Sequence, residues 1–149
     1  VIKYANCPII WCSKLQTEIA LSTTESEYIA VSQSLRNAIP LMTFLGEIDL
    51  VIPNSGRLST VHCQVFEDNK GCIDMVKMPR MRPRTKHIAL KYHHFRTHVK
   101  NKSVTVQYVD TLEQVADIFT KALPDPQFAK LRKKLTGFGG RKSSAQNKV

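Results

Sequence analysis

Two different spacings of apolar residues alternate along this chain of 149 residues, and the alternation limits the folds open to it. Short β-rich or alternating runs predict strands at Val1–Tyr4, Pro8–Ser13, Thr17–Ser22, Thr60–Phe66 and Ser103–Val109. Apolar residues that recur every three or four positions predict helices from Thr24 to Leu45, through Ile73 and Val76, from Thr85 to Val99, from Thr111 to Phe119 and over Phe128–Leu135. Strands that alternate with helices in this way predict an α/β domain, with a mixed sheet flanked by helices.

Prolines, glycines and polar runs predict where these elements end. Lys14–Gln16 is the expected turn before the third strand, and Pro40 should kink the first helix or end it early. Loops are expected over Ile52–Ser59 and over the basic stretch Met78–Arg84. Residues 1–136 then form one domain, and residues 137–149 (GFGGRKSSAQNKV) form a disordered basic tail.

The charge of the chain indicates a polyanionic partner. Twenty-two Lys and Arg against twelve Asp and Glu give a net charge of +10, with a pI near 9.7. Nucleic acid is the commonest partner for such a chain, and an anionic membrane surface is a less common one. No stretch is long and apolar enough to span a bilayer, and no signal peptide opens the sequence.

The four cysteines, Cys7, Cys12, Cys63 and Cys72, include no CxxC pair. Cys12, Cys63 and Cys72 sit in or beside apolar stretches. We therefore interpret the cysteines as reduced core thiols of an intracellular protein, with disulfides or a zinc site as the alternative.

Three acidic residues stand at the ends of predicted elements. Glu25 opens the first helix, Asp68 ends the central strand, and Asp117 lies one and a half turns into the helix after the last strand. Each has a simple structural interpretation, because Glu25 can complement the helix dipole, Asp68 can cap the next helix, and Asp117 can lie on a solvated face. Thr23 or Thr24 is the expected helix cap beside Glu25. Taken one at a time, these positions leave both structural and catalytic interpretations open.

With their neighbours, these acids lie in blocks that together resemble the ribonuclease H domain at the end of copia-type retrotransposon polyproteins. The blocks are LSTTESEYIA at 21–30, FEDNKGCI at 66–73, RPRTKHIALKYHHFR at 82–96 and VDTLEQVADIFTKALP at 109–124. The resemblance runs from about Pro8 to Leu135, and several blocks at compatible spacing make it specific.

The resemblance implies an RNase H-like fold in which acids converge on two Mg²⁺ ions, with Mn²⁺ as a substitute. By position, Glu25, Asp68 and Asp117 match three of the family's four catalytic, metal-binding acids, whereas Glu27 matches a residue that is not a ligand. Mg²⁺ prefers carboxylate oxygens, and two ions can clamp the attacking and leaving oxygens of a phosphodiester hydrolysis. The fourth acid lies on the family's first strand, upstream of Val1. We therefore expect a fragment that lacks this strand and has little or no activity by itself.

The stretch from Met75 to Val109 is strongly basic, with nine Lys or Arg, four His and no acidic residue. We interpret it as a ridge that binds the phosphates of an RNA–DNA hybrid without reading its sequence. A solvated face without a ligand is the alternative, and His94 with His98 could instead ligate a metal. The expected nucleic-acid contacts are Arg80, Arg82, Arg84, Lys86, His87, Lys91 and His94.

The function that the resemblance implies is a ribonuclease that cuts the RNA strand of RNA–DNA hybrids during reverse transcription. The implied partners are the hybrid and the reverse transcriptase upstream in the same polyprotein, without a membrane. The implied location is intracellular, in cytoplasmic virus-like particles. The alternative is a non-catalytic nucleic-acid-binding remnant with the same fold.

Overall fold

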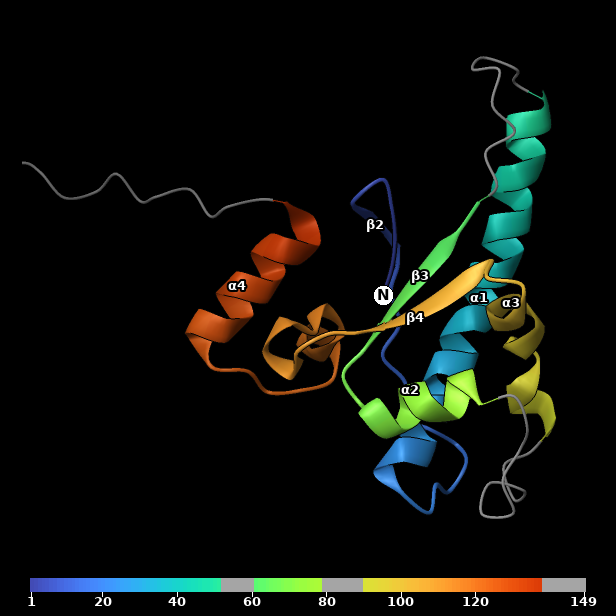
Figure 1. Ribbon diagram of the computed structural model, residues 1–149. Coiled ribbons are helices and arrows are strands. Elements are labelled where there is room, and N and C mark those ends of the chain that lie inside the picture. Colours follow the sequence, from blue (N-terminus) through green and yellow to red (C-terminus); the bar gives the residue numbers. More distant parts are fainter. Residues whose placement is uncertain (52–60, 79–89, 138–149) are drawn as a thin grey trace, which may run out of the picture. The chain divides into compact units, whose positions relative to one another are not determined.

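The computed structural model describes residues 1–51, 61–78 and 90–137, apart from the side chains of residues 49–51, 90 and 91. The chain divides into two compact units. Unit 1 combines Val1–Ser13 with the segment that begins at Leu112, and unit 2 is Lys14–Thr111. Unit 1 therefore draws on segments far apart in the sequence (Figure 1).

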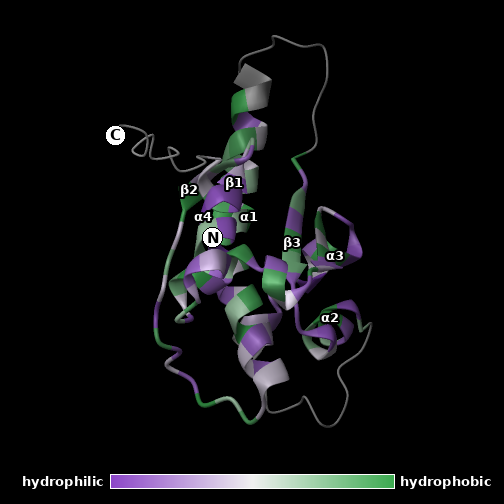
Figure 2. Cartoon of the chain, turned by 90° about the vertical axis from the view of Figure 1, so that its left-hand side faces the viewer, coloured by the Kyte–Doolittle hydropathy of each residue, from purple (hydrophilic) through white to green (hydrophobic). Residues whose placement is uncertain are grey.

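The longest element of unit 2 is α1 (Thr23–Val51), in which hydrophobic and hydrophilic residues are interspersed (Figure 2). Its buried residues include Tyr28, Val31 and Leu35, which recur every three or four positions as the sequence predicts. The helix continues through Pro40, so the prediction that this proline ends it early is wrong. A helix of this length tolerates the one backbone hydrogen bond that the proline cannot donate.

A parallel pair of strands, β3 (Cys63–Glu67) and β4 (Val104–Tyr108), forms the sheet of unit 2. Parallel strands need a crossover connection, usually helical. The described part of that connection contains α2 (Lys70–Lys77), the 3₁₀ turn η2 (Leu90–His93) and α3 (Arg96–Lys100). Both strands end at the same edge of the sheet, where Glu67 pairs with Tyr108.

Aromatic packing holds α1 in the core of unit 2. Tyr28 and Phe95 are fully buried, and their ring centroids lie 5.5 Å apart. The Tyr28 hydroxyl forms a hydrogen bond of 2.6 Å with Nδ1 of His93, so its polar end keeps a partner inside the core. Burial raises the pKa of Tyr28 to about 12. These contacts fix the first turns of α1 against the segment around η2.

Unit 1 contains an antiparallel hairpin, β1 (Ile2–Tyr4) and β2 (Cys7–Ile10). The two turn residues, Ala5 and Asn6, have φ values of 48° and 64°. Positive φ at both positions is typical of the hairpin turn whose twist matches that of the strands. The other elements are η3 (Thr111–Glu113, whose first residue belongs to unit 2), η4 (Val115–Phe119) and α4 (Asp125–Thr136). Leu131 and Leu135 form the buried face of α4.

Two predicted elements, the strand at Thr17–Ser22 and the helix from Thr111, are not present as predicted. In both segments the residue composition does not decide the secondary structure. Thr17–Ser22 forms no strand. The side chain of Ile19 within it is 90% exposed, and that of Leu15 just before it is 97% exposed. A β-rich run needs a partner strand and a buried face, and this segment has no pairing in the described residues. The helix expected from Thr111 to Phe119 is instead the two 3₁₀ segments, and Gln114 caps η4.

The prediction of a mixed α/β architecture is confirmed in this general form. Its sheet is not continuous, because the described strands make one antiparallel and one parallel pair. All four cysteines are free, but Cys7 and Cys12 are exposed, so only Cys72 is a fully buried core thiol. In the parts of the chain that the structure describes, no helix is long and apolar enough to cross a membrane.

Candidate functional site

Glu25 takes part in the hydrogen bonds that begin α1. Its backbone N–H donates to Ser22 Oγ at 3.2 Å, and its Oε2 accepts the Leu21 N–H at 2.9 Å. A serine followed three residues later by a glutamate is the capping-box pattern. Ser22 therefore caps α1, and the prediction that Thr23 or Thr24 does so is wrong. Glu25 is only 6% exposed, and its carboxylate stabilises the backbone turn that leads into α1.

Glu67, the last residue of β3, is a buried carboxylic acid that the sequence reasoning missed, and it is only 5% exposed. Burial raises its pKa to about 7, and the negative charges of Glu27 and Asp68 act in the same direction. The backbone N–H of Asn69 opposes them by donating to Glu67 Oε1 at 3.0 Å. Glu27 and Asp68 both act electrostatically on Glu67. Glu27 is thus an acidic residue of α1 whose charge acts at the end of β3.

Asp68 follows β3 directly and is half-buried. The cap of α2 is the next residue, Asn69, whose side chain accepts the Cys72 N–H at 3.0 Å. The structural interpretation of Asp68 as a helix cap is therefore wrong. Its carboxylate stands at the carboxyl end of a parallel strand, a position where parallel sheets commonly place functional side chains.

A close approach of α1 and α2 brings the start of α1 to the end of β3. Thr24 Oγ1 lies 3.4 Å from Asn69 Oδ1, beside Gly71 in α2. A Cβ atom at Gly71 would lie only 2.8 Å from Thr24 Oγ1. The absence of a side chain at Gly71 thus permits this contact.

Asp117 lies in η4, where it is buried rather than on a solvated face as one interpretation held. Its Oδ2 forms an ion pair of 2.9 Å with Lys121 Nζ, and its backbone carbonyl accepts the N–H groups of Thr120 and Lys121. Asp117 belongs to unit 1, whereas Glu25 and Asp68 belong to unit 2.

The oxygen donors of Glu27, Glu67 and Asp68 are of the chemical kind that Mg²⁺ prefers. Among the residues that the structure describes, no three acidic, histidine or cysteine side chains are grouped so that they could hold a metal ion. Mg²⁺ is usually bound by one or two carboxylates together with water and substrate phosphates. The carboxylates of unit 2 are therefore of the right chemical kind for Mg²⁺, but the described residues do not group a complete set of protein ligands.

Most of the predicted basic ridge lies outside the described residues. This applies to Arg80, Arg82, Arg84, Lys86 and His87, and to the side chain of Lys91.

His94, the one remaining member of the predicted ridge, is exposed, with Nδ1 3.4 Å from Ser32 Oγ and its ring edge-on to Phe95. His98 lies in the separate helix α3, where its Nδ1 is 3.2 Å from Ser103 Oγ. The helical i,i+4 spacing assumed for the two histidines is thus interrupted.

Comparison with known proteins finds similarity to transposon polyproteins. It is 40% identical over 134 residues to the retrovirus-related Pol polyprotein from transposon TNT 1-94 of Nicotiana tabacum. It is 30% identical over 135 residues to those from transposons RE2 and RE1 of Arabidopsis thaliana. No family model and no solved structure matches the chain.

These alignments cover 90% or 91% of the chain but 9% of each relative. The chain thus spans a small part of the length of the curated relatives it matches. It is homologous to one short segment of retrovirus-related Pol polyproteins from plant transposons.

Proposed function

We propose that this chain is the ribonuclease H segment of a copia-type retrotransposon polyprotein and hydrolyses the RNA strand of RNA–DNA hybrids. Homology to Pol polyproteins supports the polyprotein context, and the blocks around Asp68 and Asp117 support this particular segment. The observation that carries the proposal is the acidic group at the carboxyl end of β3, where Asp68 and Glu27 both act on the buried Glu67.

The contacts favour Glu27 over Glu25 as the α1 acid of this site. The resemblance assigns the role to Glu25, but its Oε2 accepts the Leu21 N–H at the helix start. Glu27 acts on Glu67 and on Cys72, as Asp68 does. A carboxylate that accepts a backbone N–H at the helix start is less available for a metal than one that acts on other acids.

Two bound Mg²⁺ ions would stabilise the attacking and leaving oxygens of the phosphodiester hydrolysis. The part of unit 2 is to present carboxylate oxygens from the end of β3 and from α1. Asp117 in unit 1 is proposed as a catalytic acid on the resemblance alone. Mn²⁺ is the proposed substitute, since it accepts the same oxygen ligands.

The test measures Mg²⁺-dependent cleavage of a labelled RNA–DNA hybrid by the chain alone and by the chain extended with the preceding part of its polyprotein. We expect little or no cleavage by the chain alone and clear cleavage by the extended protein. In the extended protein, Asp68→Asn and Asp117→Asn should abolish cleavage. Full activity of the Asp68→Asn protein would show that the proposed function is wrong.

A matched pair of variants separates the two glutamates of α1. Glu27→Gln should remove cleavage with little change in thermal stability. Glu25→Gln should retain cleavage at low temperature but lower the free energy of unfolding by about 1 kcal/mol, because it weakens the capping box. The reverse pattern would return the metal-ligand role to Glu25.

A second candidate is a non-catalytic nucleic-acid-binding remnant, which the net charge of +10 favours. Charge reversal at Arg82, Arg84 and Lys91 should weaken hybrid binding in either case, because Lys and Arg contacts release counterions. Binding without cleavage by the extended protein would favour the remnant. The proposed partners are the hybrid and an upstream reverse transcriptase, and the proposed location is a cytoplasmic virus-like particle.

A further inference from the structure

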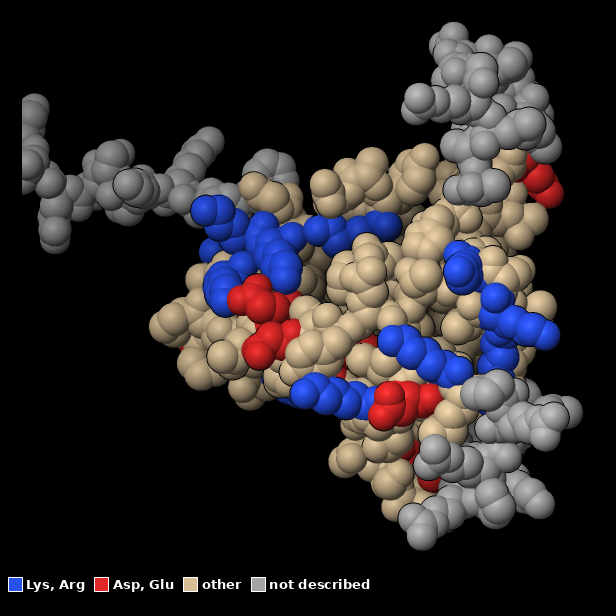
Figure 3. All heavy atoms as spheres, viewed as in Figure 1, with Lys and Arg blue, Asp and Glu red and all other residues tan. Residues whose placement is uncertain are grey.

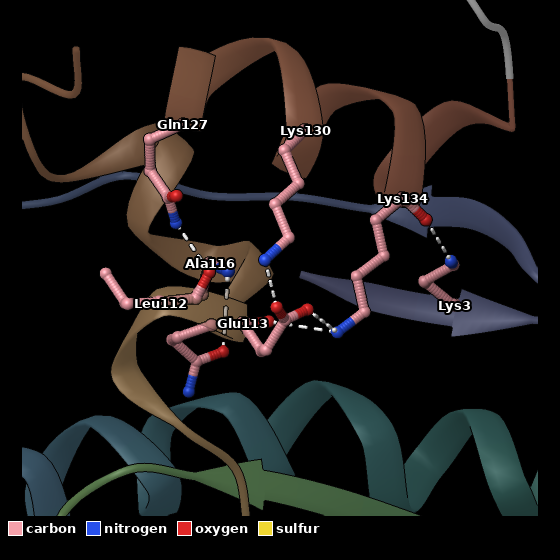
Figure 4. A network of polar contacts seen from close by, with 8 residues as sticks. Lys3, Leu112, Glu113, Ala116, Gln127, Lys130 and Lys134 are labelled. Carbon is pink, nitrogen blue, oxygen red and sulfur yellow. Dashed lines mark hydrogen bonds and ion pairs between the residues drawn. The ribbon is translucent and has the colours of Figure 1, made fainter.

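A cluster of lysines joins β1 to α4 within unit 1. Lys130 and Lys134, one turn apart on α4, both form ion pairs with the carboxylate of Glu113 in η3. Lys134 Nζ also donates to the Glu113 carbonyl at 3.1 Å, and Lys3 Nζ donates to the Lys134 carbonyl at 3.0 Å. Figure 4 shows the three ammonium groups on one side of α4. We call Lys3, Lys130 and Lys134 the α4 lysine cluster.

The α4 lysine cluster carries excess positive charge at an accessible surface. Three ammonium groups against one carboxylate leave a net charge of +2. The side chains of Lys130 and Lys134 are 51% and 47% exposed. Each ammonium group has three N–H donors, so the ion pair of Lys130 with one oxygen of Glu113 does not use them all.

The surroundings of the cluster add positive charge. Arg132 and Lys133 are exposed on the same helix, which contains no acidic residue after Asp125. In the view of Figure 3, lysine and arginine side chains gather over α4. A surface with several cations and one carboxylate suits an extended polyanion better than a single small anion.

The packing of α4 favours nucleic acid over a membrane as that polyanion. A helix that binds a membrane surface exposes a broad apolar face that enters the headgroup region. The apolar face of α4 is already used, because Leu131 and Leu135 are buried inside unit 1. A phosphodiester backbone needs only exposed cations at suitable spacing.

We propose that the α4 lysine cluster is a contact surface for the phosphate backbone of nucleic acid, separate from the basic stretch at 80–94. Glu113 holds Lys130 and Lys134 at neighbouring positions and also reduces their positive charge. The proposal goes beyond cleavage of a hybrid, because it concerns binding by unit 1 and needs no catalytic residue.

The test measures binding of the full chain to a labelled RNA–DNA hybrid, without divalent metal, over a range of salt concentrations. We expect the double variant Lys130→Gln, Lys134→Gln to bind about tenfold more weakly at low salt. The slope of log affinity against log salt should become smaller by about 2, one for each lost phosphate contact.

The matched control is the double variant Arg132→Gln, Lys133→Gln, which removes the same charge from other sides of α4. It should weaken binding less than the lysine double variant does and should retain the salt slope, because it removes surrounding charge but no proposed phosphate contact. Replacement of Lys130 and Lys134 by arginine should restore binding, which excludes a folding defect as the cause. Glu113→Gln should bind roughly threefold more tightly, because a negative charge has left the surface.

Three outcomes would overturn the proposal. In the first, the lysine double variant binds with unchanged affinity and slope. In the second, the control double variant loses as much binding, so that only total charge counts. In the third, the lysine double variant loses binding to phosphatidylserine vesicles but keeps its affinity for the hybrid. None of these outcomes depends on cleavage, so failure of the proposed function would be seen separately.

Discussion

A Cβ atom at Gly71 would meet Thr24 Oγ1 at 2.8 Å and Asn69 Oδ1 at 3.2 Å. Rotation of the Thr24 side chain offers no relief, because its Cγ2 atom is also within 3.3 Å of that position and threonine is branched at Cβ. The contact between α1 and α2 therefore depends on one residue without a side chain. This contact positions the acids of α1 beside the end of β3.

We expect Gly71→Ala to lower the free energy of unfolding by about 1 kcal/mol, because the clash exceeds the gain in helix propensity. Gly46→Ala is the matched control, since Gly46 also lies in a helix but a Cβ there meets nothing within 4 Å. That variant should gain about 0.5–1 kcal/mol. Chemical denaturation of both variants checks this, and a similar gain in each would contradict the packing argument.

The ion pairs of Glu113 with Lys130 and Lys134 should depend on pH. Hydrogen bonds from Lys130 and Lys134 hold its pKa below the ordinary value of 4.5. An acid with a lowered pKa in the folded state contributes stability above its unfolded pKa, and this is lost as pH falls through the folded value. The difference in melting temperature between the unaltered chain and Glu113→Gln should therefore be largest near neutral pH and disappear in acid.

Thermal unfolding over a pH series at low salt measures this difference. The pair is exposed, so high salt should reduce the difference at neutral pH. A difference that grows as the pH falls would contradict the assigned ion pairs.

At the scale of elements, α1 contains a proline in its interior and α4 contains one in its first turn. The N–H groups of a helix's first turn have no intrahelical partner, so proline there removes no bond. In the interior, proline removes a hydrogen bond and its ring crowds the preceding turn. The two prolines should therefore respond differently to replacement.

Pro40→Ala should raise the free energy of unfolding by about 1–3 kcal/mol, because an N–H becomes available to the carbonyl of Arg36. Pro126→Ala, at the second position of α4, should change it by less than about 0.5 kcal/mol. Denaturant titration followed by circular dichroism compares the two. A loss of stability in Pro40→Ala would contradict this prediction. It would show that the native packing of α1 needs the bend that proline introduces.

At the scale of the whole molecule, unit 1 is assembled from two distant segments, whereas unit 2 is continuous. Each unit has its own large buried side chains, such as Leu131 in α4 and Leu35 in α1. Cooperative regions of a protein often coincide with such compact units. The units should therefore lose protection from amide hydrogen exchange separately.

Leu131→Ala should lower the opening free energy by about 2–5 kcal/mol in the β1–β2 hairpin and α4, because it leaves a cavity in unit 1. Leu35→Ala should do the same for β3, β4 and the first half of α1. Hydrogen exchange measured by mass spectrometry on peptides resolves the two patterns. Equal loss of protection throughout the chain in both variants would show one cooperative unit.

The local spacing of apolar residues predicted many of the helices and strands. The apolar stripe from Tyr28 to Ala38, the strand-like alternation in 103–109 and the helix over 128–135 were all predicted and are all present. These elements follow from short-range spacing, because the same face of each must be buried whatever the rest of the chain does. The acids at the ends of these elements could therefore be located by sequence.

Only the tertiary structure decided which segments of the chain pair with one another. Thr17–Ser22 has the composition of a strand but no pairing in the described residues, and the predicted single sheet is two separate pairs. The roles of neighbouring polar residues were decided in the same way. Ser22 rather than Thr23 or Thr24 caps α1, and Asn69 rather than Asp68 caps α2.

The sequence by itself determined the type and place of most elements, the basic character of the chain and its likeness to a polyprotein segment. Only the tertiary structure identified Glu67 as a buried acid beside Asp68 and showed that the Glu25 carboxylate accepts the Leu21 N–H at the start of α1. The physical reason is that deciding interactions, such as that of Glu27 with Glu67, join residues that are far apart in the sequence. Residue spacing fixes which face of an element a side chain occupies, but the pKa of a carboxylic acid depends on which groups from other elements remove its water and face its charge.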